Sequence, residues 1–272
     1  MKIIDDRKIY PKEDTPILEH YKECFDAVKI CFLPFFQIET NSKTLSRRGK
    51  DKITLEELKE TDKIFENIKS DNIEIYESNK NYPTDEEILA YGKVIKWNNL
   101  IDNTELHDYK EINRSLKTSI GSYKKRLERL ELLNNLEEYT EKNELWLPVE
   151  GAFDVFTKIG IFNLLKKLGK NEIIVIDELY ENERTLNIKN ITKKEFINKI
   201  TFKDYYIYSK DNSILFAISW DDFFYFTVTK TEYIEQVDKI EEFEGFWADE
   251  NDTHLWDWEK GEIERLLNIS QK

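Results

Sequence analysis

The spacing of apolar residues predicts a mainly helical arrangement for residues 1–150. From Tyr109 to Tyr139, apolar side chains recur at the three- and four-residue intervals of a helix, so we expect one long helix there. Another helix is predicted to begin after Thr84, because Thr84 and Glu87 have the spacing of a capping box, and to end near Gly92. The amino-terminal half is therefore expected to be rich in helices.

Two stretches of this half depart from the helical pattern. The alternation of Val28, Ile30 and Phe32 favours a short strand. Residues 37–81 are polar, charge-rich and poor in large apolar side chains. They are predicted to form an excursion from the core that holds one helix, begun by a capping box at Thr54.

Strands dominate the pattern after residue 150. A helix is predicted from Phe153 to Leu168, ended by Gly169, and another begins at the capping box of Thr192. Strands are expected at 173–176, 184–189, 205–208, 214–220, 223–229 and near Phe246, with a helix over 232–242. The short turns between successive strands favour antiparallel pairing.

The predicted fold class is therefore α+β, with a helix-rich amino-terminal half packed on a mainly antiparallel carboxyl-terminal sheet that has flanking helices. The predicted organisation is a mainly helical region over 1–150, with the polar excursion at 37–81, and an α+β region over 151–272. No linker composition marks a boundary between them, so one continuous domain remains an alternative.

The net charge of the chain limits the kinds of molecule that it is expected to bind. The 272 residues carry 41 Lys and Arg against 55 Asp and Glu, a formal net charge of −14. Residues 201–272 hold 17 acidic and 7 basic side chains, so most of the excess lies there. Such a field repels phosphate backbones, and nucleic-acid binding is not predicted. No apolar run approaches the length of a membrane span, and we expect a soluble cytoplasmic protein without a membrane partner.

The spacing of the glycines and the small number of cysteines exclude several common functional motifs. The 8 glycines are too widely spaced for a dinucleotide-binding motif, a P-loop or a nucleophile elbow, each of which needs clustered glycines. The 2 cysteines cannot form a disulfide framework. No cofactor and no metal site is predicted.

Several short motifs carry a resemblance to a known family. They are Tyr82-Pro83-Thr84-Asp85-Glu86-Glu87-Ile88, Gly92-Lys93 with Trp97, Thr118-Ser119-Ile120-Gly121, Ser219-Trp220-Asp221 and Glu244-Gly245-Phe246-Trp247. With them, the chain resembles the domain-of-unknown-function family twenty-seven-eleven of low-GC Gram-positive bacteria over most of its length outside residues 37–81. The resemblance implies no activity, ligand or catalytic residue.

The acidic carboxyl-terminal quarter is also rich in aromatic residues, which suggests a binding surface. Carboxylates steer a basic protein and aromatic rings anchor it, although filling the core of the sheet is the more usual role of such tryptophans. Our first hypothesis is a non-catalytic binding module for a basic protein partner, like an immunity or antitoxin protein. Its candidate partner-binding residues are Trp247, Asp249, Glu250, Asp252, Trp256 and Trp258.

The alternative hypothesis is a hydrolytic enzyme that works through carboxylates or a bound metal ion. If residues 249–254 are extended, Glu250, Asp252 and His254 share one face, as metal ligands on a strand would. Asp177 and Glu178 follow a buried strand, which is a common place for catalytic carboxylates. A concave pocket with converging carboxylates favours the enzyme, and an exposed acidic face with a protruding tryptophan favours the binding module.

Overall fold

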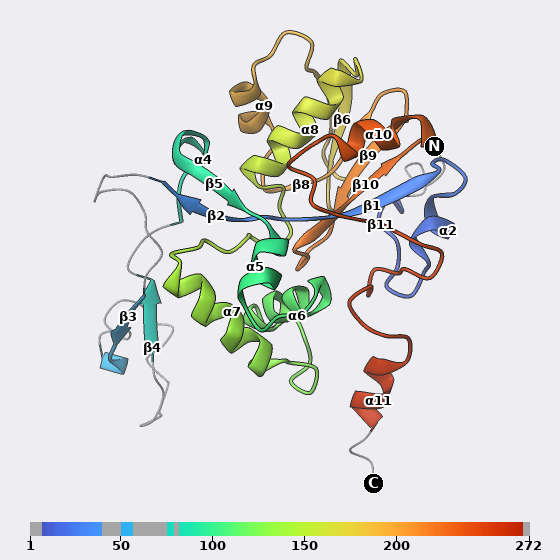
Figure 1. Cartoon of the computed structure of the whole chain (residues 1–272). Coiled ribbons are helices and arrows are strands. Elements are labelled where there is room, and N and C mark those ends of the chain that lie inside the picture. The colour runs from blue at the N-terminus through green and yellow to red at the C-terminus, as the bar shows by residue number, and fades with distance from the viewer. Residues whose placement is uncertain (1–6, 40–49, 57–74, 79–81, 269–272) are drawn as a thin grey trace.

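A seven-stranded antiparallel sheet lies at the centre of the fold (Figure 1). The computed structural model describes residues 7–39, 50–56, 75–78 and 82–268. All neighbouring strands are antiparallel, which together with the flanking helices confirms the α+β class. In order across the sheet, the strands are β11 (Gly245–Trp247), β1 (Ala27–Phe32), β10 (Phe224–Thr229), β9 (Ile214–Ile218), β8 (Asp204–Ser209), β6 (Glu172–Asp177) and β7 (Glu183–Asn187).

The amino-terminal half is not the helix-rich half that the sequence predicted, because its strands begin at Ala27. β1 lies between β11 and β10, and its Ile30 pairs with Phe226 on one side and Phe246 on the other. Period-two spacing indicated this strand, but its insertion into a sheet of distant strands depends on tertiary pairing. Two smaller antiparallel pairs are β2 (Phe35–Ile38) with β5 (Gly92–Ile95), and β3 (Lys50–Ile53) with β4 (Ile75–Ser78).

The single long helix expected from Tyr109 to Tyr139 is wrong. Two helices occupy this stretch, α6 (Tyr109–Ser119) and α7 (Leu130–Lys142). α6 ends because Gly121 adopts a left-handed φ of 67°, while the Gly121 and Ser122 amides donate to the carbonyls of Thr118 and Lys117. This pair of hydrogen bonds is a Schellman motif, which the apolar spacing on either side does not reveal.

The capping boxes predicted at Thr84 and Thr192 are confirmed, whereas the helix expected over 232–242 ends at Asp238. Thr84 and Glu87 form the predicted capping box of α4 (Asp85–Tyr91), and Thr192 forms that of α9 (Lys193–Lys199). The helix expected from Thr54 runs beyond residue 56 and so lies outside the described residues. The other helices are α2 (Ile17–Tyr21), α5 (Trp97–Asn103), α8 (Val155–Lys167), the 3₁₀ helix η2 (Thr231–Tyr233), α10 (Ile234–Asp238) and α11 (Glu262–Asn268).

Both faces of the central strands are buried. On one face of β10, Tyr225 packs against Phe153, just before α8, and against Phe243, after α10. On the other face, Phe224 and Phe226 meet residues from the two ends of the chain, as described below. Within the described residues, no helix has both the length and the apolar character needed to cross a bilayer.

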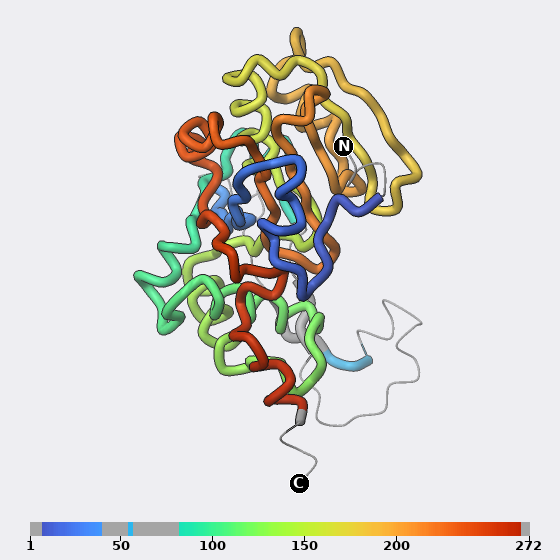
Figure 2. Tube along the Cα trace, turned by 90° about the vertical axis from the view of Figure 1, so that its right-hand side faces the viewer, coloured from blue at the N-terminus to red at the C-terminus, as the bar shows by residue number. Residues whose placement is uncertain are grey.

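The two ends of the chain meet over the second face of the sheet. Figure 2 shows the red carboxyl-terminal segment passing the blue amino-terminal segment and reaching the green helices. Tyr10 stacks on Phe226 and Trp256 packs edge-on against Phe224. The backbone amide of Ile17 donates to the carbonyl of Asp252 over 2.9 Å, which joins the two segments directly. This meeting of the ends forms the pocket described below.

The approach of β11 to β1 depends on Gly245. A Cβ atom on Gly245 would lie 1.9 Å from the backbone oxygen of Ile30, whereas one on Gly121 would meet nothing within 4 Å. We therefore expect Gly245→Ala to lower the free energy of unfolding by about 3 kcal/mol, because β11 must move away from the backbone of β1 to make room for the added methyl group. Gly121→Ala, which strains only a left-handed φ, is expected to lower it by about 1 kcal/mol. Equal losses in urea unfolding would contradict this difference.

Candidate functional site

A pocket of about 590 Å³ lies where the carboxyl-terminal segment crosses the amino-terminal turn and α6. Its volume falls within the range of ordinary ligand sites. The lining comes from three separate parts of the chain, which are residues 13–16, Lys110 and residues 250–264. We call this site the acidic pocket, and its lining residues are Glu13, Asp14, Pro16, Lys110, Glu250, Asn251, Asp252, Thr253, Leu255, Trp256, Trp258, Glu259, Lys260, Gly261, Ile263 and Glu264.

Carboxylates outnumber basic groups in the acidic pocket. Six lining side chains are Asp or Glu and two are Lys. Lys110 is paired with Glu259 at 2.6 Å, so its charge is already balanced. Within the described residues, the other carboxylates of the lining form no ion pair; they are Glu13, Asp14, Glu250, Asp252 and Glu264. A concave surface with this charge concentrates cations.

Asp252 is the most constrained carboxylate of the pocket. Its Oδ2 accepts the backbone amide of Asp249 at 2.8 Å, and Asp249 Oδ1 accepts the amide of Asn251 at 2.7 Å. Partial burial raises the pKa of Asp252, and the neighbouring charge of Asp249 raises it further against the effect of the amide. A carboxyl group with a raised pKa in a cleft is a candidate binding group.

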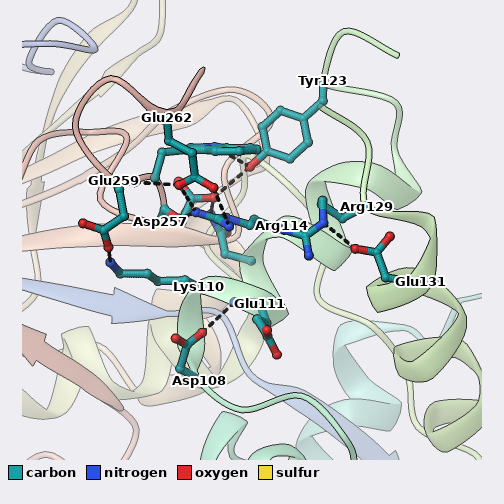
Figure 3. A network of polar contacts seen from close by, with 12 residues as sticks. Asp108, Lys110, Glu111, Arg114, Tyr123, Arg129, Glu131, Asp257, Glu259 and Glu262 are labelled. Carbon is teal, nitrogen blue, oxygen red and sulfur yellow. Dashed lines mark hydrogen bonds and ion pairs between the residues drawn. The ribbon is translucent and has the colours of Figure 1, made fainter. Parts of the chain in front are cut away.

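A buried polar network supports the inner side of the pocket (Figure 3). The Asp257 carboxylate accepts from Asn113 Nδ2 at 3.0 Å and from the Tyr123 hydroxyl at 2.7 Å. The Tyr123 hydroxyl in turn accepts from Trp258 Nε1 at 3.2 Å. These bonds fix the indole of Trp258 against the body of the molecule.

Arg114 of α6 adds a charged contact to the same network. Its guanidinium lies 4.1 Å from the centre of the Trp258 ring, donates to the Asp257 carbonyl and pairs with Glu262 at 2.9 Å. A stacked, multiply bonded Arg is a rigid element, because its planar group satisfies several partners at once. Arg114 therefore holds the start of α11 in place beside the pocket.

A second buried cluster fixes both ends of the chain next to the pocket. Asp222, just before β10, is fully buried and accepts from Lys117 Nζ at 2.7 Å and from the Tyr10 hydroxyl at 2.7 Å. His254 Nε2 lies 2.8 Å from its Oδ2. Burial raises the pKa of Asp222, but the charges and hydrogen bonds of His254 and Lys117 outweigh burial and hold it at about 2.

The structure places the six candidate partner-binding residues in different surroundings. Four of them line the acidic pocket, namely Glu250, Asp252, Trp256 and Trp258. Asp249 does not line it but holds Asp252 through its backbone amide. Trp247 lies on β11, where its Nε1 donates to Asp238 Oδ1 at 3.1 Å.

The tryptophans of the pocket contribute walls and not protruding anchors. Trp256 and Trp258 are only 5% and 7% exposed, whereas Trp220, which was not among the candidates, is 63% exposed. Within the described residues, no group of three or more His, Cys, Asp or Glu side chains is arranged to hold a metal ion. The arrangement of ligands considered for Glu250, Asp252 and His254 is therefore not found.

The five residues of the hydrolytic alternative do not form one site. Glu250 and Asp252 line the pocket, while His254 is bonded to the buried Asp222. Asp177 ends β6, which is the third strand from β10, and its carboxylate accepts from Asn182 and from the Glu181 amide. Burial raises the pKa of Asp177, but these hydrogen bonds together outweigh burial and lower it, as in an ordinary turn.

Several residues of the site had not been singled out from the sequence. Glu13, Asp14, Lys110 and Glu264 line the pocket, but they lie far from residues 249–258 along the chain or beyond them. No local pattern connects Asp14 with the carboxyl-terminal segment. The excess of acidic residues over 201–272 was the one sequence signal that pointed to any of these residues, namely Glu264.

The fold and the pocket together define an α+β protein with an acidic cleft lined by residues from both ends of the chain. Residues 13–258 match the family model described as protein of unknown function (DUF2711), so the chain belongs to this family, as its motifs indicated. No curated protein and no solved structure matches the chain.

The buried Asp222 should control stability. We expect Asp222→Asn to lower the free energy of unfolding by about 3 kcal/mol, because Lys117 would be left as a buried charge without its partner. The control is Asp221→Asn, since Asp221 has no ion pair among the described residues and Asn tolerates its φ of 59°. Urea unfolding of both variants measures the difference, and similar losses would show that the Asp222 cluster is not stabilising.

The Asp222 cluster should also determine how the free energy of unfolding changes at low pH. The pKa of Asp222 lies at about 2 in the folded chain, below its ordinary value of 3.8. A lowered carboxyl pKa stabilises the folded state fully above the ordinary value, and this contribution is lost as the pH falls through the folded value. We therefore expect the stability difference between wild type and Asp222→Asn to shrink between about pH 4 and pH 2. A constant difference would contradict this assignment.

Proposed function

We propose that this protein is a non-catalytic binding module whose acidic pocket receives Lys or Arg side chains of a basic protein partner. The observation that carries the proposal is the set of five carboxylates in the pocket that form no ion pair within the described residues. A concave shape was the feature expected of the enzyme, but His254, Asp177 and Glu178 of the hydrolytic alternative do not line this pocket, so its carboxylates are assigned to binding. Lys260, the other basic group of the lining, offsets only one of these charges. Folded proteins usually distribute opposite charges, so a cleft with an excess of one sign favours a ligand of the other sign.

The rigidity of the pocket supports a binding role. Its inner wall is held by the Asp257 and Arg114 contacts, and its connection to the sheet by the Asp222 cluster. A site that is already ordered does not lose conformational entropy when a ligand enters, which raises the affinity for a given set of contacts. An immunity or antitoxin protein that captures a basic partner would use such a preformed acidic surface.

The pocket can be tested with a probe of matched charge. We expect a short labelled peptide of Lys and Ser to bind the wild type, and the triple variant Glu250→Gln, Asp252→Asn, Glu264→Gln to bind it about tenfold more weakly. Fluorescence anisotropy at low salt measures both affinities. The effect should decrease as salt is added, because charge attraction between exposed groups is screened.

A variant with the same loss of charge elsewhere is the control. Glu23, Glu232 and Glu241 are exposed and lie outside the pocket lining, so replacing all three by Gln removes three carboxylates without altering the site. The control should retain nearly the wild-type affinity. If both triple variants weaken binding equally, the attraction comes from net charge alone and the acidic pocket is not the site.

A further inference from the structure

A second exposed surface lies at one end of the central sheet, away from the pocket lining. Four large apolar side chains there are between 41% and 72% exposed, out of seven such side chains among the described residues. None of the four lines the acidic pocket. We call this surface the sheet-end patch, and its apolar residues are Val149, Leu179, Phe202 and Trp220.

Strand register brings these residues to the same end of the sheet. Asp177 of β6 pairs with Asp204 of β8, so Leu179 and Phe202 each lie two residues beyond this pair. Tyr206 of β8 pairs with Ala217 of β9, so the chain that follows β9 runs beside the chain that precedes β8. Trp220 follows β9 by two residues and thus lies at the same end as Phe202.

Gly151 connects Val149 to this end. A Cβ atom on Gly151 would lie 3.3 Å from the Cα of Trp220 and 3.4 Å from the Tyr205 hydroxyl. The backbone amide of Gly151 also donates to the carbonyl of Asp222 at 2.9 Å. The loop that carries Val149 therefore packs directly on the turn that carries Trp220.

Each of three apolar residues in the patch has an acidic neighbour in the chain. Glu150 follows Val149, Glu178 precedes Leu179 and Asp221 follows Trp220. Burial and the charges of Glu178, Asp221 and Glu150 together raise the pKa of Tyr205 to about 12. All three carboxylates are thus close enough to act on one hydroxyl group.

The basic groups near the patch do not balance these carboxylates. Arg184 is paired with the buried Asp204 at 2.6 Å, and Lys203 lies 5.6 Å from the centre of the Phe202 ring. Within the described residues, Glu150, Glu178 and Asp221 form no ion pair. Lys203 offsets one of these three charges, so the patch combines exposed apolar side chains with an excess of negative charge.

The backbone at Trp220 is held in place by its neighbours in the chain and by Gly151. Asp221 has a left-handed φ of 59°, which is uncommon outside glycine and is held here because Asp222, the next residue, is anchored in the core. Gly151 packs against the Cα atom of Trp220 from the other side. An exposed aromatic side chain on a well-anchored backbone is a typical anchor of a protein interface.

We propose that the sheet-end patch docks a protein segment that presents apolar side chains next to Lys or Arg. The inference rests on the proposed function in that both sites take a basic partner, and it adds an aromatic anchor to the electrostatic contact of the pocket. Charge complementarity identifies the occupant. A second copy of this chain would bring another net charge of −14 to an acidic surface, and anionic lipids and nucleic acids are repelled in the same way.

Three short labelled peptides test the proposal by fluorescence anisotropy. The first contains Lys, Leu and Ser, the second Lys and Ser, and the third Glu, Leu and Ser. We expect the wild type to bind the first peptide most tightly, and Trp220→Ser to bind it about tenfold more weakly. The triple variant Glu150→Gln, Glu178→Gln, Asp221→Asn should weaken it by a similar factor and reduce its dependence on salt.

The control is Tyr91→Ser, which removes an exposed aromatic ring on α4, outside both sites. It should leave the affinity for the Lys, Leu and Ser peptide unchanged, and unfolding curves show whether each variant is folded. The proposal is overturned if Trp220→Ser binds this peptide like the wild type, or if the Glu, Leu and Ser peptide binds as tightly. It is also overturned if the wild type forms a dimer that Trp220→Ser abolishes, since the occupant is then a second copy.

The proposals for the acidic pocket and for the sheet-end patch can be contradicted independently of each other. If the patch is correct and the pocket is not, Trp220→Ser weakens the Lys, Leu and Ser peptide while the pocket variant leaves the Lys and Ser peptide unaffected. If the pocket is correct and the patch is not, the pocket variant weakens the Lys and Ser peptide while Trp220→Ser has no effect on either basic peptide.

Discussion

The buried carboxylate of Asp222 is the interaction on which the arrangement of the chain ends depends. Burial alone would favour its neutral form, yet contacts with Lys117 and His254 keep it ionised. Lys117 lies on α6, His254 in the carboxyl-terminal segment and Tyr10 in the amino-terminal segment, so one side chain joins three distant parts of the sequence to β10. The acidic pocket forms between these same parts, and its geometry is therefore a consequence of a charge that lies outside it.

Local sequence signals could predict many of the individual helices and strands of this fold. How these elements pack together could not be predicted from the same signals. The capping boxes of Thr84 and Thr192 require only neighbouring residues, and both are confirmed. The break after α6 needs a left-handed Gly121 that no apolar period indicates. Similarly, Asp221 and Asp222 resemble an ordinary turn, and the burial of Asp222 depends on Lys117, more than a hundred residues away.

Charge composition could predict the acidic character of the carboxyl-terminal quarter but not the direction of each side chain. Glu244 accepts the amides of Trp97 at 2.6 Å and Asn98 at 2.9 Å, at the start of α5, and Asp257 lies buried beneath the pocket. Glu250 lines the pocket. A carboxylate that satisfies a helix end or a buried amide contributes to folding, and only the remaining ones are free to attract a partner.

The motifs that mark the family follow the same division. Trp97 donates to the Leu33 carbonyl at 2.8 Å, its amide is held by Glu244, and Gly245 permits β11 to contact β1, so these residues are required by the fold. Trp220 belongs to another of these motifs, yet its side chain is 63% exposed and fills no part of the core. Packing does not require an aromatic ring at that position, whereas the proposed docking surface uses one, because an exposed indole contributes binding energy when a partner covers it.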